Sequence, residues 1–205
     1  SQNLNKRGIT LNLDHEDGRL LFKKLVKKAD AVVESFAPGY LRKLGLDFDS
    51  LKEVNPRIVV CSITPFGQTG PLRDYKDSNI VNDAMSGFMH IAGEAAGPPV
   101  FEGAEQTYLY AAYNGAAGVA LALYHAHRTG VGQHVDISIQ ECCFVGLEDK
   151  YIHQHWFLAK ILQMRFGVSR AGAFPWGGFE CKDGWVFMGT VSPKEWEALS
   201  KWIFE

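Results

Sequence analysis

The amino-acid sequence predicts an α/β fold in which a parallel sheet carries helices on its faces. Short apolar segments alternate with amphipathic ones over the first 65 residues, in the order β-α-β-α-β. The run at residues 57–63 is apolar and rich in β-branched side chains, which is typical of a parallel strand buried on both faces. Strands joined by helices form parallel sheets, and ligands bind such sheets at the carboxyl ends of the strands.

Each element of the opening half has its own signal. The expected elements are a strand at 9–13, a helix ending near 28, a strand at 31–34, short helices at 40–44 and 49–54, and a strand at 57–63. Asp14 offers a side-chain acceptor that can cap the first helix. Leu21 and Leu25 stand four residues apart in that helix and give it an apolar stripe that faces a core.

The second half begins with helical patterns and ends with a hairpin pattern. The expected elements are helices at 80–91, 109–128 and 141–165, a strand at 134–139, hairpin strands at 179–181 and 185–188, and a last helix from 192. The long helix is rich in alanine and glycine, so neighbouring backbones can approach it closely and we expect it to be buried. Pro193 fits the first position of the last helix, where its missing N–H costs nothing.

The composition changes near residue 170, which predicts a domain boundary. Residues 1–145 are expected to form part of a large domain, residues 146–170 a linker helix, and residues 171–205 the start of a smaller α+β domain. The chain opens directly on a strand pattern and stops inside a helical pattern. We therefore expect further sequence at both ends of this stretch.

The composition excludes several classes of partner. The chain has 205 residues, of which 46% are hydrophobic and 21% charged, and its formal net charge is −2. No basic excess indicates nucleic acid, and no polybasic run indicates a membrane surface. The most apolar stretch, residues 111–124, is shorter than a membrane span.

The four cysteines have neither disulfide nor metal-site spacing. They are Cys61, Cys142, Cys143 and Cys181. We expect buried or half-buried thiols in a reducing compartment, which predicts a cytoplasmic protein. Two histidine pairs, at 125 and 127 and at 153 and 155, are spaced by two residues. Such pairs do not face one another on a helix, so no metal site is predicted.

Five local sequences, taken in order, carry a family resemblance. They are NKRGITLNL at 5–13, ADAVVESFAPG at 29–39, NPRIVVCSITPFGQTGP at 55–71, AMSG at 84–87 with GPP at 97–99, and RTGVGQHVDIS at 128–138. Together they resemble class III CoA-transferases of the CaiB/BaiF type, a family that includes formyl-CoA transferases and 2-methylacyl-CoA racemases. The resemblance implies a Rossmann-like large domain, a smaller domain, and an interlocked dimer in which two chains thread through each other.

The resemblance also implies a covalent mechanism. In this family an aspartate attacks an acyl-CoA thioester and becomes an aspartyl-CoA thioester, which is nucleophilic catalysis by a carboxylate. When the long helix is aligned without gaps, that position holds Tyr108. A tyrosine phenol has a pKa of about 10 and is a poor nucleophile at neutral pH. Glu105 would replace the aspartate only if the alignment slipped by three residues.

His90 stands where the related racemases carry a catalytic histidine. A racemase needs two acid/base groups, and histidine suits one of them near neutral pH. The other base in racemases is the aspartate that Tyr108 replaces here. The alternative for His90 is a helix histidine that bonds to a neighbour.

By the same resemblance, the CoA-binding residues lie at the strand ends. Leu11 and Asn12 match the family's adenine-side strand end, Phe36 matches the centre of an Asn-Phe-basic motif, and Lys76 matches a lysine in the loop after Gly-Pro. Lys43 can meet a phosphate. Ala37 stands where a basic residue is expected, which weakens the grip on phosphate. Five aromatic residues suggest a bulky acyl group or a packed core: Trp156, Phe157, Phe166, Phe174 and Trp176.

These observations predict a CoA-transferase that moves CoA between carboxylic acids, with a CoA thioester as substrate and no tightly bound cofactor. The loss of the aspartate favours a catalytically silent subunit of a heteromeric enzyme over an active chain with a displaced nucleophile. The alternatives are an acyl-CoA racemase and a non-catalytic subunit that binds CoA thioesters. The partners expected are acyl-CoA, a carboxylic acid, and a second chain in a homodimer or heterodimer.

Overall fold

The computed structural model describes residues 3–146, 155–167 and 175–204. The chain divides into two compact units. The first comprises Ser1–Asn82 and Ala104–Gly146, and the second comprises Asp83–Gly103 and Leu147–Glu205. The expected boundary near residue 170 stays a prediction.

The first unit is built on a three-stranded sheet. Its strands are β1 (Ala31–Glu34), β2 (Val59–Thr64) and β3 (His134–Ser138), in the order β1-β2-β3. Both pairings are parallel, with Ala31 opposite Val59 and Val60 opposite His134. The predicted parallel sheet is therefore confirmed, and the apolar run at residues 57–63 provides its central strand.

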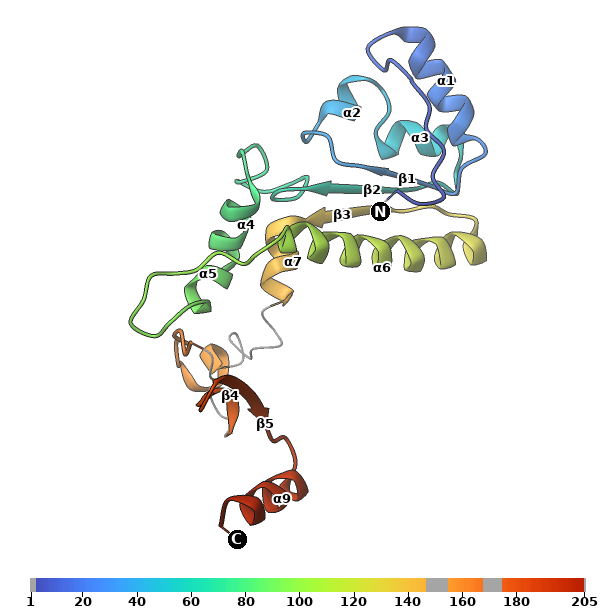
Figure 1. The fold of residues 1–205 in the computed structure, drawn as a ribbon. Coiled ribbons are helices and arrows are strands. Elements are labelled where there is room, and N and C mark those ends of the chain that lie inside the picture. Colours follow the sequence, from blue (N-terminus) through green and yellow to red (C-terminus); the bar gives the residue numbers. More distant parts are fainter. Residues whose placement is uncertain (1–2, 147–154, 168–174, 205) are drawn as a thin grey trace. The chain divides into compact units, whose positions relative to one another are not determined.

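Helices cover both faces of this sheet, as Figure 1 shows. The first face carries α1 (Glu16–Val26), α2 (Tyr40–Lys43) and α3 (Phe48–Val54), and the other carries α6 (Gln106–Thr129). Successive residues of β2 point to opposite faces, so each face has its own core. The core below α1–α3 contains Val26, Leu41, Leu46, Leu51, Ile58 and Val60. The cores on the α6 face contain Val59, Cys61, Ala111, Ala122, Ala126, Ile137, Ile139, Cys142 and Cys143.

A Leu51→Ala substitution is expected to lower the free energy of unfolding by about 2–5 kcal/mol. Leu51 is 0% exposed in the core between α3 and the sheet, so the change leaves a cavity. Urea denaturation measures the loss. Leu20→Ala on α1, where the side chain is 51% exposed, is the matched control and is expected to cost less than about 1 kcal/mol. Equal losses for the two variants would contradict this assignment of the core.

The opening of the chain differs from its predicted form. Residues 9–13 form no strand, and Ile9 is 71% exposed. The alternating pattern is present, but these residues have no neighbouring strand to pair with among the described residues. The helix cap is also different, since His15 rather than Asp14 accepts the hydrogen bond from the Asp17 amide.

The predicted helix at residues 80–91 is two helices. α4 (Asn79–Ser86) and α5 (Phe88–Ile91) are separated by Gly87, which has φ of 92°. This left-handed conformation costs a glycine little and ends the helical hydrogen bonding. The long predicted helix is confirmed as α6, which is followed after β3 by α7 (Ile139–Gly146).

The second unit contains the predicted hairpin. β4 (Trp176–Cys181) and β5 (Gly184–Gly189) pair antiparallel across a two-residue turn, and α9 (Pro193–Phe204) follows with proline at its first position. A short π-helix, η2 (His155–Ala159), is the only helical segment between residues 155 and 167. Lys160 has φ of 55°, which ends η2, and residues 160–166 have no regular structure. The continuous helix predicted at 141–165 is therefore wrong at these residues, and the linker predicted at 146–170 stays a prediction.

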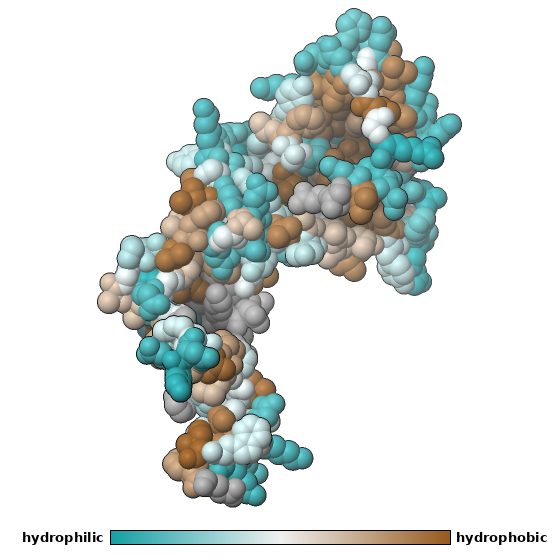
Figure 2. Space-filling model, in the orientation of Figure 1, coloured by the Kyte–Doolittle hydropathy of each residue, from teal (hydrophilic) through white to brown (hydrophobic). Residues whose placement is uncertain are grey.

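Apolar side chains remain on the surface of the first unit. Figure 2 shows hydrophobic residues, in brown, on the part of this face that α1, α3 and β1 occupy, with hydrophilic residues around them. The exposed ones in these elements include Leu20, Leu21, Leu25 and Val33. Val33 is 61% exposed and lies on β1, an outer strand of the sheet.

Candidate functional site

A cavity of about 610 Å³ lies where the segments that follow β1 and β2 meet the first turn of α6. It brings together three of the residues predicted from the sequence, namely Phe36, Lys76 and Tyr108. Its other lining residues are Ser35, Ala37, Pro38, Ile63, Pro65, Arg73, Asp74, Tyr75, Asp77 and Ile139. The carboxyl ends of parallel strands are the usual place for a ligand in such a sheet.

Tyr108 is the third residue of α6, and hydrogen bonds fix this end of the helix to the start of α4. The Thr107 hydroxyl donates to the Asn79 side-chain oxygen, and Asn79 Nδ2 donates to the Ala104 carbonyl over 3.0 Å. Thr107 is 2% exposed, so its hydroxyl needs such a partner. The phenol of Tyr108 therefore projects from an anchored helix end.

The Tyr108 phenol is not activated for nucleophilic attack. Partial burial raises its pKa above 10, and the nearby negative charges of Asp77 and Glu105 raise it further. Both effects disfavour the phenolate. At neutral pH Tyr108 is a neutral hydroxyl that can donate a hydrogen bond.

The charge effects on Tyr108 can be measured. Asp77→Asn and Glu105→Gln are each expected to lower the pKa of the Tyr108 phenol, because each removes a negative charge that opposes its ionisation. The effect of Asp77→Asn is expected to be the larger of the two. Ultraviolet titration of each protein against the same protein carrying Tyr108→Phe isolates this phenol. A rise in the pKa after either substitution would contradict the arrangement.

Phe36 is held in the cavity wall by the turn after β1. Its backbone amide donates to Glu34 Oε2 over 2.7 Å, and its ring packs on Tyr40 with 4.9 Å between ring centroids. The Tyr40 hydroxyl donates in turn to Asp14 Oδ1 over 3.2 Å. This bond links the start of α2, where Tyr40 lies, to the segment before α1, where Asp14 lies.

The cavity contains charged residues that the motif comparison did not single out. Arg73 pairs with Asp74 at 3.2 Å, whereas Lys76 forms no ion pair with any described residue. Asp77 Oδ2 accepts a hydrogen bond of 2.7 Å from Asn82 Nδ2. The signal in the sequence was the charged run at residues 73–77, directly after the glycine-rich loop.

The other residues predicted to form the site do not line this cavity. Leu11 is half-buried and Asn12 is exposed, and Asn12 Oδ1 accepts from the Asp14 amide over 3.0 Å. Lys43 is exposed on α2, and Glu105 is exposed at the cap of α6, where its side chain makes no capping bond.

His90 lies in the second unit, on α5. Its Nε2 atom is buried and has no hydrogen-bond partner among the described residues. Its carbonyl accepts from Arg165 Nη1 over 2.9 Å. Of the aromatic group expected near the acyl chain, Trp156, Phe157 and Phe166 are exposed, whereas Phe174, like His153, lies outside the described residues.

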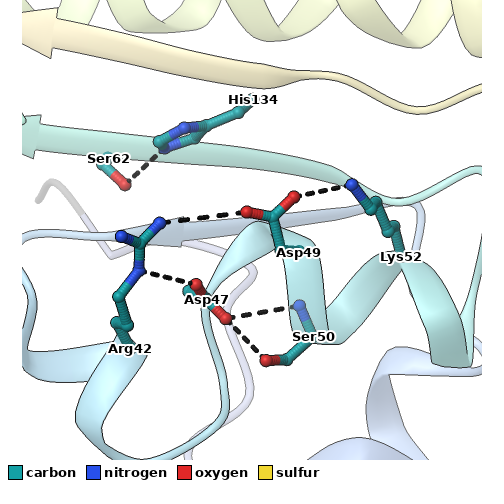
Figure 3. Close-up of polar contacts among 7 residues, drawn as sticks. All are labelled: Arg42, Asp47, Asp49, Ser50, Lys52, Ser62 and His134. Atoms are coloured by element: carbon teal, nitrogen blue, oxygen red, sulfur yellow. Dashed lines mark hydrogen bonds and ion pairs between the residues drawn. The ribbon is translucent and has the colours of Figure 1, made fainter.

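A second cavity, of about 320 Å³, lies on the α2–α3 side of the sheet. Three of its charged residues, Arg42, Asp47 and Asp49, form ion pairs, as Figure 3 shows. Arg42 contacts Asp47 at 3.1 Å and Asp49 at 3.8 Å, and Lys52 contacts Asp49 at 2.6 Å. Partial burial acts to raise the pKa of Asp47, but hydrogen bonds from Ser50 and Arg42 outweigh it and lower that pKa. The Arg42 side chain is 76% exposed, so these surface ion pairs contribute little to stability.

The same cavity contains a serine–histidine contact. Ser62 Oγ lies 2.9 Å from His134 Nε2, as Figure 3 shows. The His134 ring stacks on Phe48 with 5.9 Å between ring centroids. Ser62 is only 4% exposed, and no carboxylate of the described residues contacts His134. A nucleophilic serine needs an accessible hydroxyl and an oriented base, so this pair does not form a catalytic triad.

The buried thiols do not supply a nucleophile either. Cys61, Cys142 and Cys143 form no disulfide with any described residue and are buried, as predicted, whereas Cys181 is exposed because it ends β4 at the hairpin turn. Burial, followed by the charge of Glu141, raises the pKa of Cys142 to about 11. The thiolate is the nucleophilic form, so this side chain is inert at neutral pH.

Within the described part of the chain, no three histidine, cysteine or acidic side chains gather in a way that could hold a metal ion. The described helices also include none that is both long and apolar enough to cross a membrane.

Comparison with known proteins agrees with the geometry. The family model described as CoA-transferase family III matches residues 1–205. The chain is 36% identical over 203 residues to the succinyl-CoA–L-malate CoA-transferase beta subunit of Chloroflexus aurantiacus, covering 98% of this chain and 50% of that protein. It is 37% identical over 204 residues to the succinyl-CoA:(R)-benzylsuccinate CoA-transferase subunit BbsE of Thauera aromatica, covering 98% and 48%.

A solved structure shows the same fold. The crystal structure of a CaiB/BaiF family protein from Brucella suis superposes with a TM-score of 0.82 at 30% identity, over 97% of this chain and 52% of that one. The chain spans about half the length of the curated relatives it matches.

Proposed function

Because this chain belongs to CoA-transferase family III, we propose that the whole protein moves coenzyme A between carboxylic acids by way of acyl-CoA thioesters. The observation that carries the proposal is the 610 Å³ cavity, which joins Phe36, Lys76 and Tyr108 at one edge of the parallel sheet. An aromatic ring and a lysine that pairs with no described acidic residue, beside a helix N-terminus, suit an acyl thioester whose carbonyl oxygen becomes negative during attack.

The chemistry needs a carboxylate nucleophile, and Tyr108 cannot be that group. A phenol does not form the acyl anhydride from which CoA is passed on, and the raised pKa of Tyr108 keeps it protonated. The carboxylate has two possible sources, which are another residue of this chain and a homologous subunit that keeps an aspartate.

The names of the relatives favour a heteromeric enzyme. The relatives include an alpha subunit and a beta subunit of a succinyl-CoA–L-malate CoA-transferase and a subunit of a benzylsuccinate enzyme. We propose that this chain also works in a dimer with a homologous subunit, interlocked as the family resemblance implies, and acts in the cytoplasm. A homodimer is the competing assembly, and native mass spectrometry of the co-expressed proteins separates the two.

The activity is tested by exchange of CoA between succinyl-CoA and candidate acids such as L-malate. The protein is assayed alone and together with the product of a neighbouring homologous gene. Exchange in either sample supports the proposal, and exchange in the mixture only identifies a dependent subunit. No exchange in both samples, across a broad set of acids, would reject it.

The two remaining alternatives make different predictions. A racemase would exchange the α-hydrogen of a 2-methylacyl-CoA for deuterium and would lose this activity in His90→Ala. A subunit that only binds CoA thioesters would bind succinyl-CoA without exchange in any mixture. Neither alternative has a specific observation in its favour among the described residues.

A further inference from the structure

The cavity around Tyr108 contains a carboxylate in a favourable position. Two acidic residues line it, Asp74 and Asp77, whereas Glu105 does not. Asp74 is exposed and pairs with Arg73. Asp77 is half-buried and forms no ion pair with any described residue.

Asp77 is held by one oxygen and free at the other. Its Oδ2 atom accepts the 2.7 Å bond from Asn82, whose side chain is 0% exposed on α4. Its Oδ1 atom accepts no hydrogen bond from any residue that the structure describes. The Asn82 amide is buried and does not ionise, so its hydrogen bond orients the Asp77 carboxylate. The Oδ1 atom of Asp77 is left available for reaction.

The position of Asp77 relative to Tyr108 is set by the same contacts that anchor α6. Asn79, two residues after Asp77, bonds to Thr107 and to the Ala104 carbonyl at the start of that helix. Asp77 lines the same cavity as Tyr108, whereas Glu105, at the cap of the same helix, does not. Asp77 therefore lies beside the end of α6 where the family resemblance places the lost nucleophile.

We infer that Asp77 is the nucleophile of this chain and takes up the acyl group at the cavity in place of a side chain at position 108. This inference rests on the proposed CoA transfer and would make the chain active in its own right. It also replaces Glu105 as the candidate for a displaced carboxylate.

The reaction balances with the groups in the cavity. Asp77 Oδ1 attacks the thioester carbonyl, the C–S bond breaks, and CoA leaves as the thiolate from a mixed anhydride. The thiolate then attacks the aspartyl carbonyl, which releases the donor carboxylate and leaves an aspartyl-CoA thioester. The acceptor carboxylate reverses these two steps with its own acyl group, so no oxidant, reductant or net proton is required.

Neighbouring groups can stabilise the charge that develops. The free N–H groups of the first turn of α6 carry a partial positive charge, which favours an oxyanion nearby. The neutral Tyr108 hydroxyl can donate a hydrogen bond to the same oxygen. Tyr108 thus has a supporting role in this scheme, and its loss is expected to slow exchange by about 100-fold.

The test traps the acyl-enzyme without an acceptor acid. The purified protein is incubated with succinyl-CoA, quenched with hydroxylamine, digested and analysed by mass spectrometry. A hydroxamate on Asp77 is expected. Asp77→Asn is expected to abolish the adduct and to slow exchange by about 1,000-fold or more, and the amide oxygen of the new side chain can still accept the bond from Asn82.

Glu105→Gln is the matched control. It removes an equal charge beside Tyr108 but lies outside the cavity, and it is expected to change exchange by less than about threefold. An unmodified Asp77, or exchange that survives Asp77→Asn, would overturn the inference. If exchange appears only in the mixture with a homologous subunit and Asp77 stays unmodified, the inference fails and the proposed function stands. If neither exchange nor a hydroxamate appears, both fail.

Discussion

In a protein that already carries Asp77→Asn, adding Tyr108→Asp is expected to restore CoA exchange by about 100-fold. That gain corresponds to about 2.7 kcal/mol of transition-state stabilisation. The second substitution returns a carboxylate to the same cavity, at the third residue of α6, where the helix N-terminus favours negative charge. The exchange assay with succinyl-CoA measures the restoration, and hydroxylamine trapping locates the new adduct at position 108.

Tyr108→Phe in the same background is the control for this rescue. It removes the phenol without supplying a carboxylate, so exchange is expected to stay at the level of Asp77→Asn alone. If both double variants regained the same exchange activity, the gain would come from the loss of tyrosine and not from the new carboxylate. A failure of Tyr108→Asp to form any adduct would mean that the acyl group does not reach the end of α6.

Gly132→Ala is expected to lower the free energy of unfolding by at least about 3 kcal/mol. A Cβ atom at this position would lie 1.9 Å from the carbonyl oxygen of Ile58, which is backbone and cannot rotate away. The Gly132 amide also donates to the Pro56 carbonyl over 2.8 Å, so the close approach joins the start of β3 to the segment before β2. Urea denaturation followed by circular dichroism gives the loss.

Two other glycines provide comparisons for this substitution. Gly8→Ala adds a methyl group with nothing within 4 Å and is expected to change stability by less than about 0.5 kcal/mol. Gly130→Ala also meets nothing within 4 Å, but its φ of 78° is expected to cost about 1–2 kcal/mol. If Gly132→Ala were no worse than Gly130→Ala, the close approach to the Ile58 carbonyl would not limit stability, and the expectation would be wrong.

The parts of the fold that the sequence predicted well are those with strong local patterns. Residues 31–34 match β1 from end to end, and the two-residue turn at 182–183 joins β4 and β5. The alanine- and glycine-rich pattern found α6 within three residues at its N-terminus. In these segments local preference and tertiary packing agree.

The failures have local physical causes. Residues 9–13 have the alternating pattern of a strand but form none. A strand needs a neighbouring strand to bond to, and the pattern does not specify one. Gly87 divides the predicted helix at 80–91 because its left-handed backbone ends α4, and a glycine inside a helical pattern does not by itself reveal which conformation it adopts.

The candidate site was only partly predictable. Motif comparison found Phe36, Lys76 and Tyr108 because each has a counterpart in the family pattern. Asp77 was not among the motif residues, and what distinguishes it is a contact with Asn82, on α4. Its place near Tyr108 depends on the hydrogen bonds of Asn79 to Thr107 and Ala104, and the sequence alone does not reveal these long-range contacts.

The two outer strands of the three-stranded sheet affect how this stretch of chain behaves at high concentration. Among the described residues, β1 and β3 each leave one side without a hydrogen-bonded neighbour. Val33 exposes an apolar side chain on β1, whereas β3 carries the exposed polar residues His134 and Asp136. A strand of another molecule can pair with an open strand edge, and charged side chains on the edge oppose this pairing. Self-association at high concentration would therefore begin along β1.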